Sequence, residues 1–202
     1  MDWSEFINFR DLGGLPTVDG GEIQAGALLR SGCHNQLPPA AIRAIRGSRM
    51  VSRIVDLRWA KECRTHPSPF AEDEIYRHMP LLNDVLTYTP PPDSYGPMLD
   101  HNQERIGAAF RAVAEAPPGG VLVHCRAGKD RTGVLVALLL TAAGVDAAVT
   151  ARDYARSDSS LEGTMRETLA HLDRRYGGIA DYLATVGVGS ETLAAARNRL
   201  LR

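Results

Sequence analysis

One cysteine and a cluster of charged side chains separate two apolar runs near the middle of the chain. The stretch VLVHCRAGKDRTGVLVALLL occupies residues 121–140, and its titratable side chains are confined to positions 124–131. Cys125 ends the first apolar run, and Arg131 stands six residues later at the start of the second. This pattern predicts a strand, a short turn and a helix, with a thiol and a guanidinium at the two ends of the turn.

The predicted turn has the features of a site for a tetrahedral anion. The first N–H groups of a helix lack helical partners, and the helix dipole is positive at that end. Gly128 permits a positive φ, so that successive N–H groups can face one point, and the planar fork of Arg131 can hold two oxygens. The predicted phosphate-binding residues are Arg126, Ala127, Gly128, Lys129, Asp130, Arg131 and Thr132. We expect a phosphate or sulfate ion to bind in this loop.

Cys125 is the predicted nucleophile of this loop. Thiols beside cations at a helix N-terminus ionise more readily than free cysteine, and the thiolate is the nucleophilic form. The Thr132 hydroxyl is placed to hydrogen-bond the sulfur. Attack of sulfur on phosphorus would give a cysteinyl-phosphate that water then cleaves. The chemistry needs no metal or other cofactor, because the loop amides and Arg131 supply the positive charge.

A general acid must protonate the departing oxygen, and the sequence offers three candidates. Asp130 in the loop ranks first, Asp56 at the end of another predicted strand second, and Asp84 in a proline-rich segment third. Asp56 and Arg58 are also expected to form a structural ion pair beside the site. His124 is expected to hold the loop by a hydrogen bond rather than to transfer a proton.

Two further groups of residues are interpreted as supporting structure. Asn8, Arg10 and Asp11 lie in a turn-rich opening and are expected to hydrogen-bond the underside of the site. Trp3 and Trp59 are expected to contribute packing rather than recognition.

Gly128-Lys129 suggests a different motif, the nucleotide-binding P-loop, but the spacing excludes it. That motif requires Ser or Thr after the lysine and a glycine five residues before the second glycine. Asp130 and Val123 occupy those two positions.

The surrounding sequence predicts an α/β fold with a mostly parallel central sheet flanked by helices and a helical C-terminal third. Short strands are expected at 27–30, 52–57, 75–81 and 121–123. Helices are expected at 40–47, 98–116, 131–143, 146–156, 160–176, 179–186 and 190–201. Residues 83–98 contain three consecutive prolines, and we interpret them as a long surface segment that could cover a site. In such sheets ligands bind at the carboxyl ends of strands, where the loop after residue 123 lies.

The composition favours one soluble globular domain over residues 1–202. Hydrophobic residues make up 44% of the 202-residue chain and the net charge is -1, so no basic field points to nucleic acid. The longest apolar run, residues 133–145, is too short to span a membrane, and the N-terminal residues do not resemble a signal peptide. We therefore expect a cytoplasmic protein. Secretion without a cleavable signal stays open as an alternative.

The cysteine count argues against a disulfide framework. The chain has three widely spaced cysteines, Cys33, Cys63 and Cys125, and no CxxC or paired His/Cys spacing that would suggest a metal site. Cys33 and Cys63 are expected to be free thiols in or near the core.

The loop HCRAGKDRTG, from His124 to Gly133, resembles the active-site loop of the cysteine-dependent protein tyrosine phosphatase superfamily. Lys129 and Asp130 make it similar to the bacterial tyrosine phosphatases that include secreted mycobacterial and listerial enzymes. Further stretches resemble the same family across nearly the whole chain. These are NFRDLGGLPTVDG at 8–20, LLRSG at 28–32, IVDLRWAKE at 54–62, DYARSD at 153–158 and RRYGGIADYLATVGV at 174–188.

The resemblance implies a single phosphatase domain with Cys125 as nucleophile and Arg131 as the phosphate-binding arginine. It implies phosphotyrosyl protein or peptide substrates, with dual specificity or phosphoinositide (lipid) hydrolysis as alternatives. Lys129 is either a second cation for a multiply phosphorylated substrate or part of the general positive field. The Trp-Pro-Asp signature of the tyrosine-specific branch is absent from the sequence, which favours Asp130 as the acid. Residues 83–105 could form a lid, although their prolines argue against the helical lid of relatives.

Overall fold

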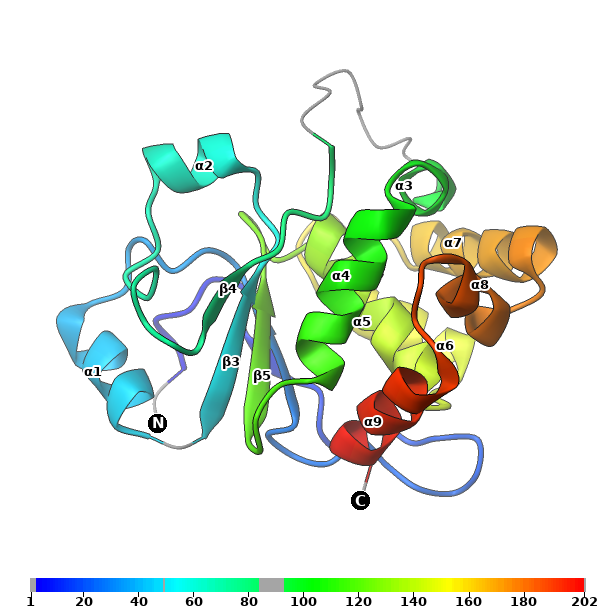
Figure 1. Cartoon of the computed structure of the whole chain (residues 1–202), viewed down its shortest axis with the longest axis horizontal. Helices are drawn as coiled ribbons and strands as arrows, with labels where there is room; N and C mark the ends of the chain where they lie inside the picture. Colours follow the sequence, from blue (N-terminus) through cyan, green and yellow to red (C-terminus); the bar gives the residue numbers. More distant parts are fainter. Residues whose placement is uncertain (1–2, 49, 84–92, 202) are drawn as a thin grey trace.

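The computed structural model describes residues 3–48, 50–83 and 93–201, and its centre is a five-stranded sheet. The sheet order is β1-β2-β5-β3-β4 (Figure 1). The strands are β1 (Arg10–Asp11), β2 (Leu28–Ser31), β3 (Val51–Asp56), β4 (Tyr76–His78) and β5 (Gly120–His124). The pairs β2–β5, β5–β3 and β3–β4 are parallel, and only the edge strand β1 pairs antiparallel, with β2. The predicted mostly parallel α/β fold is therefore confirmed.

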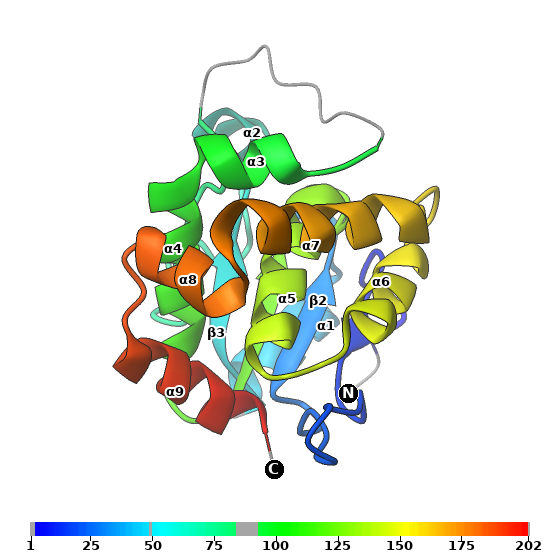
Figure 2. The same cartoon turned by 90° about the vertical axis from the view of Figure 1, so that its right-hand side faces the viewer.

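Helices cover both faces of the sheet, and those of the C-terminal third lie on one side of it (Figures 1 and 2). Helix α1 (Pro39–Gly47) lies on the opposite side. The other helices are α2 (Ala60–Thr65), α3 (Gly96–His101), α4 (Gln103–Ala114), α5 (Asp130–Ala142), α6 (Ala147–Ala155), α7 (Glu162–Tyr176), α8 (Ile179–Thr185) and α9 (Ser190–Leu200). In the part of the chain that the structure describes, every helix is too short or too polar to cross a bilayer.

The central strand β5 divides the hydrophobic core into two layers. Successive side chains of a strand point to opposite faces of the sheet. Accordingly, Leu122 packs in the smaller cluster on the α1 side with Ile54, whereas Val121 and Val123 pack in the larger cluster under the C-terminal helices. All three β5 side chains are fully buried. Because β5 is held on both faces and by two neighbouring strands, the loop that follows it starts from a rigid point.

Helix α5 is apolar around almost its whole circumference, which is the pattern of a helix buried inside a domain. Every residue from Arg131 to Leu140 is buried. The helix contacts β5 and β2 on one side and α4, α6, α7, α8 and α9 on others. Its N-terminus is consequently fixed at the carboxyl edge of the sheet, where β5 and β3 end in register at His124 and Asp56.

The structure differs from the predicted elements in three places. The expected helix over 98–116 is two helices, α3 and α4, because the Asn102 side chain turns back to bond the Met98 carbonyl and the Asn83 amide. The expected strand over 75–81 is shorter, at Tyr76–His78. Helix α2 and the two-residue strand β1 were not predicted, since neither is long enough to show a hydrophobic period.

The close packing of α4 against the chain after α8 gives a test of this fold. A Cβ added at Gly107 would overlap the Val186 carbonyl oxygen, which is backbone and cannot move aside. We therefore expect Gly107→Ala to destabilise the protein by about 2 kcal/mol, despite the better helix propensity of alanine. Gly163→Ala in α7 is the matched control, because its Cβ would meet nothing within 4 Å. Urea unfolding measures both, and equal stabilities for the two variants would contradict the packing.

Candidate active site

The predicted loop lies where β5 ends and α5 begins, at the carboxyl edge of the sheet. Gly128 has φ +72°, in the left-handed region that glycine favours. A Cβ at this position would also lie 2.5 Å from the Ser31 carbonyl oxygen. Both facts require glycine here, because the loop turns tightly against the end of β2.

Four consecutive carbonyls of the loop are hydrogen-bonded on its outer side. The Cys125 carbonyl accepts from His124 Nδ1 at 3.2 Å, and the Arg126 carbonyl accepts from the Cys33 N–H at 2.9 Å. The carbonyls of Ala127 and Gly128 both accept from Asn8 Nδ2, at 3.2 and 3.0 Å. Within a planar trans peptide the N–H points away from the C=O. The amides of residues 126–129 therefore face the inner side of the loop, which is the arrangement of an anion-binding nest.

A buried polar network holds this outer side of the loop. Arg30 donates to the Gly128 carbonyl at 2.9 Å and pairs with Asp153 at 3.0 Å. Arg10 pairs with the other oxygen of Asp153 at 3.0 Å and orients Asn8 through a bond of 2.7 Å. Burial, together with the charge of Arg10, lowers the pKa of Arg30 to about 10, so it remains a cation. Two guanidiniums and one carboxylate thus fix the loop from beneath.

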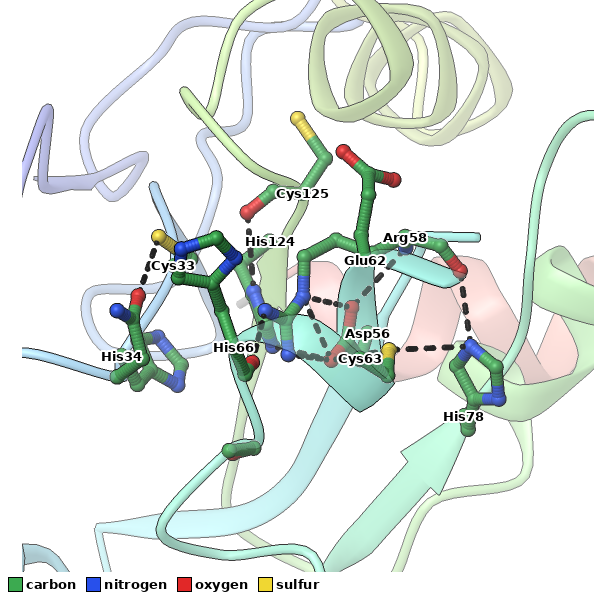
Figure 3. Close-up of polar contacts among 12 residues, drawn as sticks. Cys33, His34, Asp56, Arg58, Glu62, Cys63, His66, His78, His124 and Cys125 are labelled. Atoms are coloured by element: carbon green, nitrogen blue, oxygen red, sulfur yellow. Dashed lines mark hydrogen bonds and ion pairs between the residues drawn. The ribbon is translucent and has the colours of Figure 1, made fainter. Parts of the chain in front are cut away.

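Cys125 is 3% exposed and its side chain points to the same side as Glu62 (Figure 3). The figure shows the sulfur and the Glu62 carboxylate turned away from Asp56, which lies below them with Arg58. Arg30 and Arg131 both interact electrostatically with the Cys125 thiol. Two guanidinium charges therefore act on the Cys125 thiol.

Glu62 occupies the hydrogen-bonding edge of Arg131. Its carboxylate accepts from Arg131 Nη1 at 2.5 Å and from Nη2 at 2.9 Å. Burial would raise the pKa of Glu62, but the hydrogen bonds and the charge of Arg131 hold it below its ordinary value. Arg131 also stacks on Trp59, with 4.8 Å from the guanidinium carbon to the ring centroid. Trp59, which we expected only to pack, thus contacts the phosphate-binding candidate directly.

Two cavities flank this ion pair. The larger, of about 830 Å³, is lined by residues that include Trp59, Lys61, Arg64, Arg126 and Arg131. The smaller, of about 350 Å³, lies on the Cys33 side and shares Glu62, His66 and Arg126 with the first. In the described ranges Lys61, Arg64 and Arg126 form no ion pair within 4.0 Å. The mouth of the loop is therefore cationic.

Two of the three candidate general acids lie in the described residues, and their surroundings differ. Asp130 is half-buried at the first turn of α5 and accepts a short hydrogen bond from the Tyr95 hydroxyl. Asp56 is fully buried and is held by Arg58 at 2.6 Å and by the Tyr76 hydroxyl at 2.7 Å. Asp84 lies outside the described residues.

Asp56 is held in its ionised form by a buried ion pair. Burial would raise its pKa, but His124 and the Arg58 guanidinium hold the pKa well below its usual range. His124 itself is fully buried, and burial lowers its pKa, so Arg58 is the charge that acts on Asp56 at neutral pH. The interpretation of Asp56 and Arg58 as an ion pair agrees with this geometry (Figure 3).

Two predicted contacts are not made, and the cysteines are free. The Thr132 hydroxyl is buried without a hydrogen-bond partner in the described part of the chain, so its predicted bond to the Cys125 sulfur is absent. Asp11 caps the amides of Gly13 and Gly26, away from the loop. Cys33 and Cys63 are half-buried free thiols, and burial raises the pKa of Cys63 to about 11.

Several residues at the site carried no readable signal in the sequence. Glu62 and Tyr95 stand 69 and 35 residues before their partners in the loop, and Arg30 stands 98 residues before Gly128. Asp153 acts on the loop through its ion pair with Arg30. As parts of the resemblance, the stretches LLRSG, IVDLRWAKE and DYARSD include Arg30, Glu62 and Asp153, and of these four residues only Tyr95 lies outside all of the quoted stretches.

Comparison with known proteins identifies the family of the chain. The chain matches the family model described as "Tyrosine phosphatase family" over residues 1–166, and it therefore belongs to that family. It is similar to a tyrosine-protein phosphatase of Nostoc commune, with 28% identity over 72% of this chain and 65% of the relative. It is also similar to the triple specificity protein phosphatase PtpB of Mycobacterium tuberculosis, with 38% identity over 40% of this chain and 33% of the relative. The chain thus spans less than two thirds of the length of these relatives.

The Glu62–Arg131 pair predicts how the loop responds to an anion. Because Glu62 occupies both Nη atoms of Arg131, a phosphate must displace it to be held by the same edge. We expect Glu62→Gln to tighten the binding of inorganic phosphate about fivefold, equivalent to about 1 kcal/mol. Isothermal titration measures the change.

The matched control for this substitution is Glu167→Gln. Glu167 forms an exposed ion pair with Arg174 on α7, so its replacement should leave phosphate affinity unchanged. Weaker binding in Glu62→Gln would show that Glu62 orients Arg131 for the anion instead of competing with it.

Proposed function

We propose that this chain hydrolyses phosphate monoesters of protein tyrosine residues through a cysteinyl-phosphate intermediate. The observation that carries the proposal is the set of four outward-bonded carbonyls, at Cys125, Arg126, Ala127 and Gly128. They leave the amides of residues 126–129 pointing away from those partners, and in the proposal these amides bind the phosphate together with Arg131 beside Cys125. Family membership and the names of the relatives support the same chemistry.

In the first step the Cys125 thiolate attacks phosphorus in line with the ester oxygen. The S–P bond forms as the P–O ester bond breaks, and the departing oxygen takes a proton from Asp130 to leave as the free phenol. The inward amides and Arg131 stabilise the charge on the three non-bridging oxygens. Glu62 releases Arg131 when the dianion enters.

In the second step water attacks the phosphorus of the cysteinyl-phosphate. The Asp130 carboxylate takes a proton from that water, the S–P bond breaks, and inorganic phosphate and the Cys125 thiolate are released. Asp130 is again protonated for the next turnover. Asp130 is favoured as the acid because it stands at the edge of the loop, while Asp56 is bound by Arg58 and fully buried.

The cationic mouth favours an anionic peptide around the phosphotyrosine. Arg126 and Arg64 are exposed and line the larger cavity with Trp59, whose ring offers an apolar wall.

The proposal also includes substrates other than phosphotyrosine, because one relative is named a triple specificity phosphatase. Release of phosphate from phosphotyrosyl peptides, phosphoseryl peptides and phosphoinositide vesicles at matched enzyme concentration ranks the substrate classes. Faster release from the vesicles would replace the protein substrate with a lipid one.

Two substitutions test the chemical steps. Cys125→Ser should abolish hydrolysis of p-nitrophenyl phosphate, whereas Cys63→Ser, the control thiol, should retain it. Asp130→Asn should lower kcat/KM about 10²-fold or more for phenyl phosphate, whose leaving group needs protonation, and much less for p-nitrophenyl phosphate. An exposed aspartate on α7, Asp173, supplies the matched Asp→Asn control.

The outcomes separate the two assignments. Hydrolysis by Cys125→Ser at the wild-type rate would overturn the nucleophile. Equal losses of Asp130→Asn on both esters would overturn the acid and leave the nucleophile standing.

A further inference from the structure

Two buried tyrosines form a hydroxyl chain that ends on Asp130. The Tyr95 hydroxyl donates to Asp130 Oδ1 and lies 2.8 Å from the Tyr154 hydroxyl. Tyr95 and Tyr154 are 4% and 3% exposed. They come from different parts of the fold, since Tyr95 directly precedes α3 and Tyr154 belongs to α6 (Figure 2). Three elements therefore meet at one carboxyl group.

The direction of the hydrogen bonds follows from the number of protons. Burial, with the bonds to Asp130 and Tyr154, raises the pKa of Tyr95 far above its ordinary value, so the phenol keeps its single proton. Because that proton is donated to Asp130, Tyr95 must accept from the Tyr154 hydroxyl. The chain therefore runs from Tyr154 through Tyr95 to Asp130 Oδ1.

Each tyrosine is fixed independently of Asp130. The Tyr95 N–H donates to the Thr168 hydroxyl of α7 at 2.8 Å. The Tyr154 ring packs against the first turn of α5, where a Cβ on Gly133 would lie 2.7 Å from it. The two rings meet edge to face, with centroids 6.1 Å apart. The hydroxyl of Tyr95 is consequently presented to Asp130 from a rigid support.

We propose that Tyr95, supported by Tyr154, is a positioning residue that sets the carboxyl group of Asp130 for proton transfer. By engaging Oδ1, Tyr95 leaves Oδ2 as the oxygen that carries the proton. It also fixes the plane of the carboxyl group against rotation about the Cβ–Cγ bond. Proton transfer depends on such placement, because an acid must come within hydrogen-bond reach of the leaving oxygen. This inference rests on the proposed function, in which Asp130 is the acid.

The free-energy cost of burying a hydroxyl group supports a positioning role for the hydroxyls of Tyr95 and Tyr154. A buried hydroxyl costs free energy unless it is hydrogen-bonded, and phenylalanine would fill the same volume without that requirement. At Tyr182, another buried tyrosine, the hydroxyl bonds a backbone group, the Leu99 carbonyl. At Tyr95 the hydroxyl meets a carboxyl group of the loop instead.

The experiment compares Tyr95→Phe with Tyr182→Phe, the matched control, on two aryl phosphates. We expect Tyr95→Phe to lower kcat/KM about tenfold on phenyl phosphate and less than about twofold on p-nitrophenyl phosphate. Tyr182→Phe should leave the ratio of the two substrates unchanged. In the double variant Tyr95→Phe/Asp130→Asn, the phenyl phosphate loss should equal that of Asp130→Asn alone, because Tyr95 acts through Asp130.

A second variant covers the case in which Tyr95→Phe does not fold. Tyr154→Phe removes the outer bond only and should shift the substrate ratio in the same direction by a smaller factor. An unchanged ratio in the folded Tyr95→Phe protein, or in Tyr154→Phe if Tyr95→Phe is insoluble, would overturn the inference. So would additive losses in the double variant.

The failure of this inference is distinguishable from failure of the proposed function. If Asp130→Asn shows the leaving-group dependence and Tyr95→Phe does not, Asp130 is the acid without help from Tyr95. If Asp130→Asn itself lacks the dependence, the assignment of the acid fails first, and the positioning role falls with it.

Discussion

The orientation of four peptide groups is the constraint on which the rest of this site depends. The carbonyls of residues 125–128 are bonded outward by His124, the Cys33 amide, Asn8 and Arg30. Because a trans peptide has its N–H opposite its C=O, these bonds determine where the amides point. The direction of the loop amides therefore depends on residues outside the loop as well as on the loop itself. The buried Arg10–Asp153–Arg30 network is expensive to desolvate, and its two ion pairs of 3.0 Å offset that cost.

A second set of contacts acts on the side chains proposed to carry the chemistry. Glu62 pairs with Arg131, and Trp59 stacks on the same guanidinium. Tyr95 holds Asp130 from another direction. In each of these contacts a candidate functional side chain has a partner that keeps it in a single orientation. Preorganised groups pay little reorganisation free energy during reaction.

The sequence predicted the parts of the molecule that have a period or a local motif. Helix α5 and strand β5 were predicted because each is an apolar run and the two flank one short turn. The predictions of Cys125 as nucleophile and Arg131 as phosphate-binding arginine rest on the spacing within that turn. The short helix α2 was missed because its six residues have no apolar period, and its start is set by the bond from the Trp59 N–H to Glu62.

Contacts between distant segments account for what the sequence could not show. Glu62 stands 69 residues before Arg131, and Tyr95 stands 35 residues before Asp130. No local pattern marks either residue, because each is placed by the packing of the whole domain. The Thr132 hydroxyl shows the converse, since its position in the motif suggested a bond to sulfur that the packed structure does not make.

The inward direction of the loop amides is tested most directly by NMR. Inorganic phosphate is added to the ¹⁵N-labelled protein, and the amide resonances of Ala127, Gly128 and Lys129 are followed. The account predicts that these amides shift together and saturate at one binding constant, as donors to a single anion. If phosphate leaves these three resonances unshifted and shifts the resonances of amides elsewhere, the loop does not bind the anion.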